Sequence, residues 1–131
     1  MLPTIFRLLP LLALLCTACQ QRRSVPPTSM KQLEGTWLSS REEDSGDTLV
    51  YRPNTYAFPP ARGRTGFAVG PFGRFEQFDI APTDGLAGRP GTWTADGPAH
   101  LRIHLEDGHE PDYTLEVLSL EKKVLKLRRL P

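Results

Sequence analysis

The stretch that decides the fold reads Thr92-Trp93-Thr94-Ala95-Asp96-Gly97 and continues, two residues later, as His100-Leu101-Arg102-Ile103-His104-Leu105. Its second part alternates strictly between polar and apolar side chains, which is typical of a β-strand with one buried face. That face carries Leu101, Ile103 and Leu105. The Asp-Gly pair between two runs of strand-forming residues is a strong short signal for a hairpin. The stretch therefore predicts two neighbouring antiparallel strands.

The same pattern continues on both sides of this hairpin. Short runs of strand-forming residues are separated by turn residues at intervals of about 8 to 12, the spacing of a β-sandwich or barrel. One helical turn is predicted at residues 29–33, with Ser29 as its N-cap. The fold class is all-β: a small antiparallel β-barrel or strongly curled sheet that leaves few edges bare. We expect about eight strands, drawn from the runs at residues 36–41, 48–52, 55–58, 66–69, 74–80, 92–95, 100–105, 113–117 and 124–128.

A segment of another kind precedes this domain. An apolar, uncharged run covers residues 8–18, follows Arg7 and ends at Cys19. A helix needs roughly 20 residues to cross a bilayer, and this run is about half as long. We therefore interpret it as an export signal and not as a membrane span.

The end of that segment, Leu15-Cys16-Thr17-Ala18-Cys19, resembles the lipobox of bacterial lipoproteins. The resemblance implies cleavage before Cys19, acylation of its sulfur by chains such as palmitate, and attachment to a membrane through that acyl anchor. Cys16 stands where the lipobox usually has Leu, and ordinary secretion with cleavage nearby is the alternative. The predicted organisation is a signal peptide at 1–18, a tether at 19–29 and one β domain at 30–131. Processing uses both cysteines, so no disulfide is expected.

Charge and tether composition bear on partners and location. The chain has a formal net charge of +1, and loss of residues 1–18 removes Arg7 and no acidic residue, which leaves a charge of zero. Nucleic-acid binding requires a basic excess, so we expect no nucleic-acid partner. In lipoproteins of bacteria with two membranes, Asp after the acylated Cys favours the inner membrane. Gln20 at this position implies the outer membrane, if the source has one, and otherwise a lipid-anchored place in the cell envelope.

A second resemblance lies in the β domain itself. The sequence Leu33-Glu34-Gly35-Thr36-Trp37 resembles the opening signature of lipocalin-like domains, and Gly91-Thr92-Trp93 resembles the second Gly-x-Trp of lipocalin-like bacterial lipoproteins. The resemblance implies that Gly35, Trp37, Gly91 and Trp93 are structural signature residues. It also implies that Trp37 closes one end of a barrel, beneath Arg128 or Arg129 in cation–π contact. As an alternative, both tryptophans are simply large core residues.

The region from residue 59 to 89 is rich in Gly and Pro and is the candidate contact region. Its two guanidinium forks at Arg62-Gly63-Arg64 suit carboxylate or phosphate. Surface ion pairs with Glu76, Asp79 and Asp84 are the alternative. The candidate contacts are Arg62, Arg64, Arg74 and Arg89, interleaved with Phe67, Phe72, Phe75 and Phe78.

Catalytic and metal signatures are weak. His100 and His104 share a strand face but stand about 13 Å apart, too far for one ion. No serine elbow, phosphate-binding loop or thiol nucleophile is recognisable, so we expect neither an enzyme nor a cofactor or metal site.

Two functions remain. One is a lipocalin-like lipoprotein that binds a small apolar or amphipathic ligand, which burial of the four phenylalanines around a cavity of a few hundred Å³ would favour. The other is an envelope interaction protein whose filled barrel presents residues 59–89 to a protein partner. Exposed Phe, Tyr and Arg side chains would favour the second.

Overall fold

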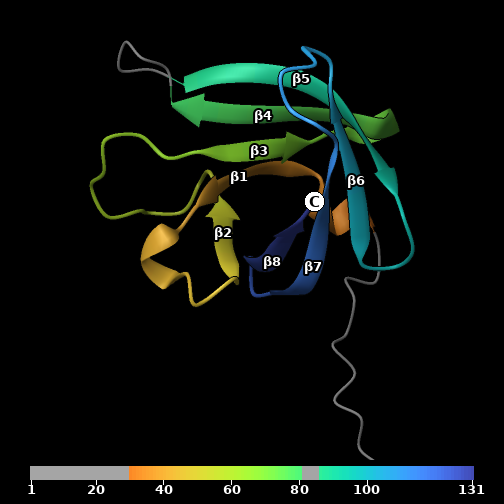
Figure 1. Ribbon diagram of the computed structural model, residues 1–131. Helices are drawn as coiled ribbons and strands as arrows, with labels where there is room; N and C mark the ends of the chain where they lie inside the picture. Colours follow the sequence, from red (N-terminus) through yellow and green to blue (C-terminus); the bar gives the residue numbers. More distant parts are fainter. Residues whose placement is uncertain (1–29, 81–85) are drawn as a thin grey trace, which may run out of the picture.

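A computed structural model describes residues 30–80 and 86–131 of the chain. Its architecture is a closed barrel of antiparallel strands in the order β1-β2-β8-β7-β6-β5-β4-β3 (Figure 1). The sequence prediction of a small all-β barrel with about eight strands is therefore confirmed. The export signal, the tether and Cys19 lie outside the described residues.

The elements are short. The part of the chain that the structure describes contains three one-turn 3-10 helices, η1 (Met30–Leu33), η2 (Arg41–Glu43) and η3 (Pro71–Gly73). Within the described part of the chain, no helix has the length and apolar character to cross a membrane. The strands are β1 (Gly35–Ser39), β2 (Leu49–Pro53), β3 (Gly66–Val69), β4 (Arg74–Ile80), β5 (Leu86–Ala95), β6 (His100–Leu105), β7 (Tyr113–Glu121) and β8 (Val124–Leu130).

The strand order departs from a simple meander at one place. Strands β3 to β8 follow one another around the barrel, but β1 lies between β2 and β3, and β2 pairs with β8 to close the wall. In an up-and-down barrel each strand lies beside its neighbours in the sequence. Here residues 54–65 instead carry the chain from β2 past β1 to β3.

The two ends of the barrel differ. We call the end where β1 begins the floor and the end where β1 finishes the mouth. Because all strand pairs are antiparallel, the β3–β4, β5–β6 and β7–β8 turns lie at the floor, and the β1–β2 and β6–β7 connections lie at the mouth (Figure 1). The predicted helical turn is present as the 3-10 helix η1 at the floor, and its expected N-cap, Ser29, lies outside the described residues.

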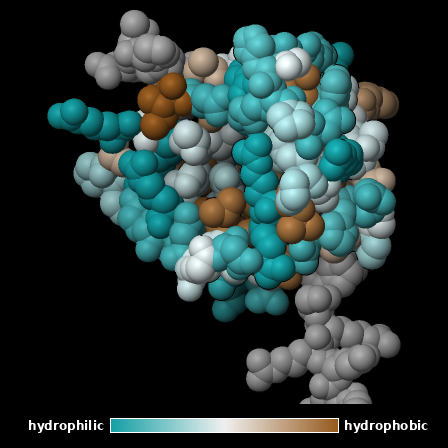
Figure 2. All heavy atoms as spheres, viewed as in Figure 1, coloured by the Kyte–Doolittle hydropathy of each residue, from teal (hydrophilic) through white to brown (hydrophobic). Residues whose placement is uncertain are grey.

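Every second side chain of a strand points into the barrel, and most of these inward side chains are apolar. The predicted inward face of β6 is confirmed, since Leu101, Ile103 and Leu105 are all buried. The most deeply buried large side chains are those of Leu33, Leu101, Ile103, Leu125 and Leu127. At the floor, Trp37 is buried and its Nε1 donates a hydrogen bond to the carbonyl oxygen of Leu33 at 2.8 Å. The outer surface seen in Figure 2 is largely hydrophilic, with small, separated apolar patches.

One strand prediction was wrong, and another strand is longer than predicted. Residues 55–58 form no strand, because β2 already has β1 and β8 on its two edges. Hydrogen bonds from the Tyr56 N–H to the Pro53 carbonyl and from the Phe58 N–H to the Tyr56 carbonyl turn the segment instead.

The strand predicted at 92–95 starts six residues earlier, as β5, because Arg89-Pro90 does not break it. The carbonyl of Pro90 accepts from the Glu106 N–H, on the side of β5 that faces β6. In a strand, the N–H and C=O of one residue point the same way, so the missing N–H of Pro90 also lies on that side. Pairing between β5 and β6 ends at Gly91 opposite Leu105, and proline is tolerated at such a ladder end.

Candidate functional site

The mouth of the barrel holds a small hollow of about 170 Å³, which we call the mouth hollow. It is walled by side chains from strands β2, β3, β4, β7 and β8. One part of the wall is apolar and aromatic, and another part is polar. The lining residues are Leu49, Tyr51, Thr65, Gly66, Phe67, Gln77, Phe78, Asp79, Tyr113, Leu115 and Arg129.

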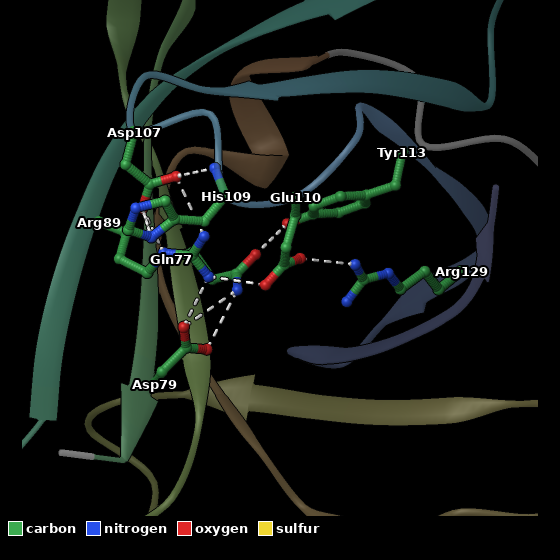
Figure 3. A network of polar contacts seen from close by, with 8 residues as sticks. All are labelled: Gln77, Asp79, Arg89, Asp107, His109, Glu110, Tyr113 and Arg129. Atoms are coloured by element: carbon green, nitrogen blue, oxygen red, sulfur yellow. Dashed lines mark hydrogen bonds and ion pairs between the residues drawn. The ribbon is translucent and has the colours of Figure 1, made fainter. Parts of the chain in front are cut away.

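Strand parity explains how polar groups reach the interior. On β4, Gln77 and Asp79 follow Phe75 at every second position, so they share its inward face. Arg89 lies opposite Gln77 on β5. The β6–β7 connection contributes Asp107 and Glu110, whose carboxylates both point toward Arg89 (Figure 3). The charge network of the mouth consists of Gln77, Asp79, Arg89, Asp107, Glu110, Tyr113 and Arg129.

Arg89 is the centre of the charge network. Its Nε and Nη2 donate to the two carboxylate oxygens of Asp107 at 2.7 and 3.1 Å. Its Nη1 donates to Asp79 at 2.9 Å and to Glu110 at 2.7 Å. These hydrogen bonds lower the pKa of Asp107 to about 2 and also lower the pKa of Glu110. Every nitrogen of this guanidinium is used within the protein, so Arg89 cross-links the rim of the mouth.

Arg129 is held more loosely. Its Nη2 donates to Glu110 at 3.1 Å, and its guanidinium carbon lies 3.9 Å from the ring centroid of Tyr113. The cation–π contact expected over Trp37 is therefore made over Tyr113. Arg128, the other expected partner of Trp37, pairs with Asp47 at 3.1 Å. A guanidinium has five N–H donors, and the side chain of Arg129 is half exposed, so donors remain for another group.

Two tyrosines line the mouth hollow, and their hydroxyl groups differ in hydrogen bonding. The Tyr113 hydroxyl donates to Gln77 Oε1, and Gln77 Nε2 donates in turn to Asp79 at 3.0 Å. The ring of Tyr51 packs against Phe67 with centroids 5.0 Å apart. Among residues 30–80 and 86–131, its hydroxyl makes no hydrogen bond. Burial raises the pKa of both tyrosines, so both are protonated donors at neutral pH.

The four candidate arginines do not form one surface. Arg64 is only 7% exposed and fixes the segment before β3. It donates to the carbonyls of Ser39 and Pro59, each at 2.9 Å, and forms a bidentate pair with Glu42. Arg62 is exposed, and Arg74 borders an open groove outside the barrel. Of the predicted ion pairs, Asp79 pairs with an arginine of this set, whereas Asp84 lies outside the described residues.

The four phenylalanines divide between core and surface. Phe67 and Phe75 are buried and stack with centroids 5.7 Å apart. Phe78 is half-buried at the mouth hollow. Phe72, on the β3–β4 turn, is 99% exposed.

The signature residues have structural roles. Gly35 opens β1 with a φ of +132°. A Cβ on Gly91 would lie 2.3 Å from the carbonyl oxygen of His104, so the β5–β6 pair requires glycine there. Trp93 is half-buried and donates from Nε1 to the Gly70 carbonyl at 3.0 Å, which ties β5 to the β3–β4 turn.

The sequence prediction missed most of the residues at the mouth. The alternation of inward and outward side chains along β4 could have identified Gln77 and Asp79. Tyr51, Tyr113 and Arg129 are brought together only by the pairing of their strands. Within the described ranges, no group of three or more His, Cys, Asp or Glu side chains is placed to hold a metal ion. His104 instead contacts Asp112, with Nδ1 2.7 Å from a carboxylate oxygen.

Comparisons with protein-family models, curated proteins and solved structures return no match to this chain.

Proposed function

We propose that this protein is a lipid-anchored, lipocalin-like β-barrel lipoprotein that holds one small amphipathic molecule in the mouth hollow. The observation that carries the proposal is a partly apolar hollow lined by the Tyr51 hydroxyl, which makes no hydrogen bond within the described residues, and by Arg129, which has spare N–H donors. A bound oxygen acceptor could take hydrogen bonds from both side chains.

The size of the hollow limits the ligand. A cavity of 150 Å³ lined by apolar side chains is enough to bind benzene, and the mouth hollow measures about 170 Å³. Pockets for drug-sized ligands start at roughly 300 Å³. The ligand class is therefore a molecule of about one ring, smaller than the cargo that a cavity of a few hundred Å³ would take.

The lining of the hollow defines the chemistry of that molecule. Leu49, Phe67 and Leu115 offer apolar contacts for its body. Tyr51 and Arg129 offer donors for a hydroxyl or carboxylate at its other end. Arg89 takes no part in this recognition, because its donors are already engaged by carboxylates of the rim.

The direction of the chain fits an anchored carrier. The described residues begin at η1, at the floor, so an acyl anchor on Cys19 would attach the domain by the end opposite the mouth. The hollow would then face away from the membrane and stay open to small molecules of the envelope. Outer-membrane attachment follows if the source has two membranes.

One observation favours the second candidate function, an envelope interaction protein. Phe72 is fully exposed and lies on the turn beside an open groove of about 410 Å³, which Ala68, Arg74 and Pro90 help to line. Phe72 lies within the region 59–89, and the groove is lined mostly by residues within or next to that region. The groove lies on the outer wall of the barrel and shares no lining residue with the mouth hollow, so the two functions are separable by mutation.

Ligand binding is tested with the processed chain, residues 19–131 carrying Cys19→Ser, and with three ring probes. We expect benzoate and p-cresol to bind and toluene, which has no acceptor, to bind more weakly, as measured by chemical-shift titration and native mass spectrometry. Tyr51→Phe and Arg129→Gln should each weaken benzoate binding roughly threefold to tenfold. Tyr56→Phe and Arg62→Gln are the matched controls. A protein without bound mass, with shifts that no probe perturbs, would overturn the carrier proposal.

Acylation has its own control in this chain. Cys19→Ser should abolish incorporation of labelled palmitate in a bacterial host, whereas Cys16→Ser should retain it, because Cys16 leaves with the signal peptide. Equal labelling of the two variants would contradict attachment at Cys19.

A further inference from the structure

Among residues 30–80 and 86–131, three non-glycine residues adopt positive φ angles, and all three are exposed. Phe72 has a φ of 57°, Lys122 of 50° and Lys123 of 61°. The left-handed region is disfavoured for side chains with a Cβ, and a bulky residue there is an outlier. Two-residue hairpin turns with both φ angles positive prefer Asn-Gly, yet this chain has Lys-Lys between β7 and β8.

A neighbouring turn follows the ordinary rule. The β5–β6 turn contains Asp96-Gly97, with the positive φ of 77° on glycine. The residues of the other two turns are thus poorly suited to their backbone conformation. Backbone strain of this kind gathers at functional sites. The side chains on these two turns are therefore candidates for a functional contact.

Both unusual turns lie at the same end of the barrel. By strand direction, the β3–β4 turn with Phe72 and the β7–β8 turn with Lys122 and Lys123 both belong to the floor end, as η1 does. The two turns lie on opposite sides of the barrel (Figure 1). Cys19 precedes η1 by a short stretch of sequence. The floor is therefore the end that an anchor at Cys19 would bring to a membrane.

The side chains at the floor fit a lipid surface better than a folded partner. Phe72 is 99% exposed, and the neighbouring Arg74 is exposed as well. An exposed aromatic side chain next to Arg, with two lysines across the same end of the barrel, has the aromatic and basic composition of interfacial membrane contacts. Asp96 and Glu121 lie at the same end, so the attraction to anionic lipid comes from the lysine turn and not from a large net charge.

We propose that the floor of the barrel rests on a bilayer containing anionic lipids. Phe72 inserts at the boundary between headgroups and acyl chains, and Lys122 and Lys123 contact headgroup phosphates. The proposal of a membrane as the partner of this surface rests on the proposed lipid anchor at Cys19. The contact itself needs no acyl chain. In the cell it would orient the barrel, with the mouth pointing away from the lipid.

The test uses substitutions that relieve the strain, so a loss of binding cannot come from unfolding. The processed chain with Cys19→Ser is mixed with vesicles of phosphatidylcholine and phosphatidylglycerol, and binding is measured by flotation. We expect binding that weakens on vesicles of phosphatidylcholine alone. Phe72→Asn, and the double variant Lys122→Asn with Lys123→Gly, should lower the partition coefficient, on the order of fivefold for each lysine removed. Their Tm values should be unchanged or higher.

Matched controls remove the same chemistry from elsewhere on the barrel. Arg62→Asn removes an exposed cation, and Ile80→Asn removes an apolar side chain that is 48% exposed at the mouth. Both should bind vesicles as the parent chain does. The proposal is overturned if the parent chain does not float with anionic vesicles, or if the floor variants bind as well as the controls. Benzoate binding by the floor variants should be unchanged, so failure here leaves the carrier proposal standing and the reverse also holds.

Discussion

Replacing Tyr113 by Phe removes a single hydroxyl from the mouth and leaves the ring in place. That hydroxyl donates to Gln77, and both residues are almost fully buried. A net loss of about 1 kcal/mol is expected for the hydrogen bond, rising to about 3 kcal/mol if the Gln77 oxygen stays buried without a donor. The contact of Arg129 with the ring should survive. For a domain of this size, a loss of about 1 kcal/mol lowers Tm by roughly 4–8 °C.

The measurement is a double-mutant cycle in urea. The free energies of unfolding of Tyr113→Phe, Gln77→Met and the double variant are compared, and a coupling energy of about 0.5–1.5 kcal/mol is expected. Tyr56→Phe is the control, since its ring is 40% exposed and the change should lie within about 0.5 kcal/mol of zero. A coupling energy near zero, with Tyr113→Phe as stable as the parent, would refute the interpretation of this hydrogen bond.

Two further predictions concern the fold. The pKa values of Glu42, Glu43 and Asp107 are each lowered to about 2, chiefly by hydrogen bonds from Arg64, Arg52 and Arg89. Carboxylates in the unfolded chain titrate near pH 4. The stability that these ion pairs provide is therefore complete above about pH 5 and is lost as the pH falls toward 2. Equal urea midpoints at pH 7 and pH 3 would contradict this prediction. Gly66→Ala would place a Cβ 2.1 Å from a backbone oxygen of β1, so we expect it to destabilise the domain by about 1–3 kcal/mol in urea, and a neutral effect would show that β1 and β3 can separate freely.

The sequence predicted this fold correctly where the local pattern of residues agrees with the strand pairing of the barrel. The alternation from His100 to Leu105 gave the correct inward face of β6, because a side-chain period of two leaves a single choice of face. Asp96-Gly97 gave the correct turn, since Gly97 has the positive φ that the turn requires. The run at 55–58 satisfied strand propensity, yet no sheet edge was free to receive it.

The first half of β5 was missed for the opposite reason. Its glycine and proline residues look like breaks, but this half of β5 pairs with β4 throughout, with Gly88 opposite Phe78 and Pro90 opposite Glu76. The mouth was missed because strand order brings its residues together. Arg89 and Arg129 meet Glu110 only through pairings that no local pattern contains.

The pairing of β2 with β8 also governs when the barrel can form. Leu49 and Tyr51 lie opposite Leu127 and Leu125, so an early strand closes the wall with the last strand in chain order. Until β8 is present, β2 and β7 each keep an open edge that can pair with another chain. Contacts of such sequence separation make closure slow. Wherever folding takes place, the chain must therefore be available through Leu127 before the barrel can close, and the two edges stay open for that interval.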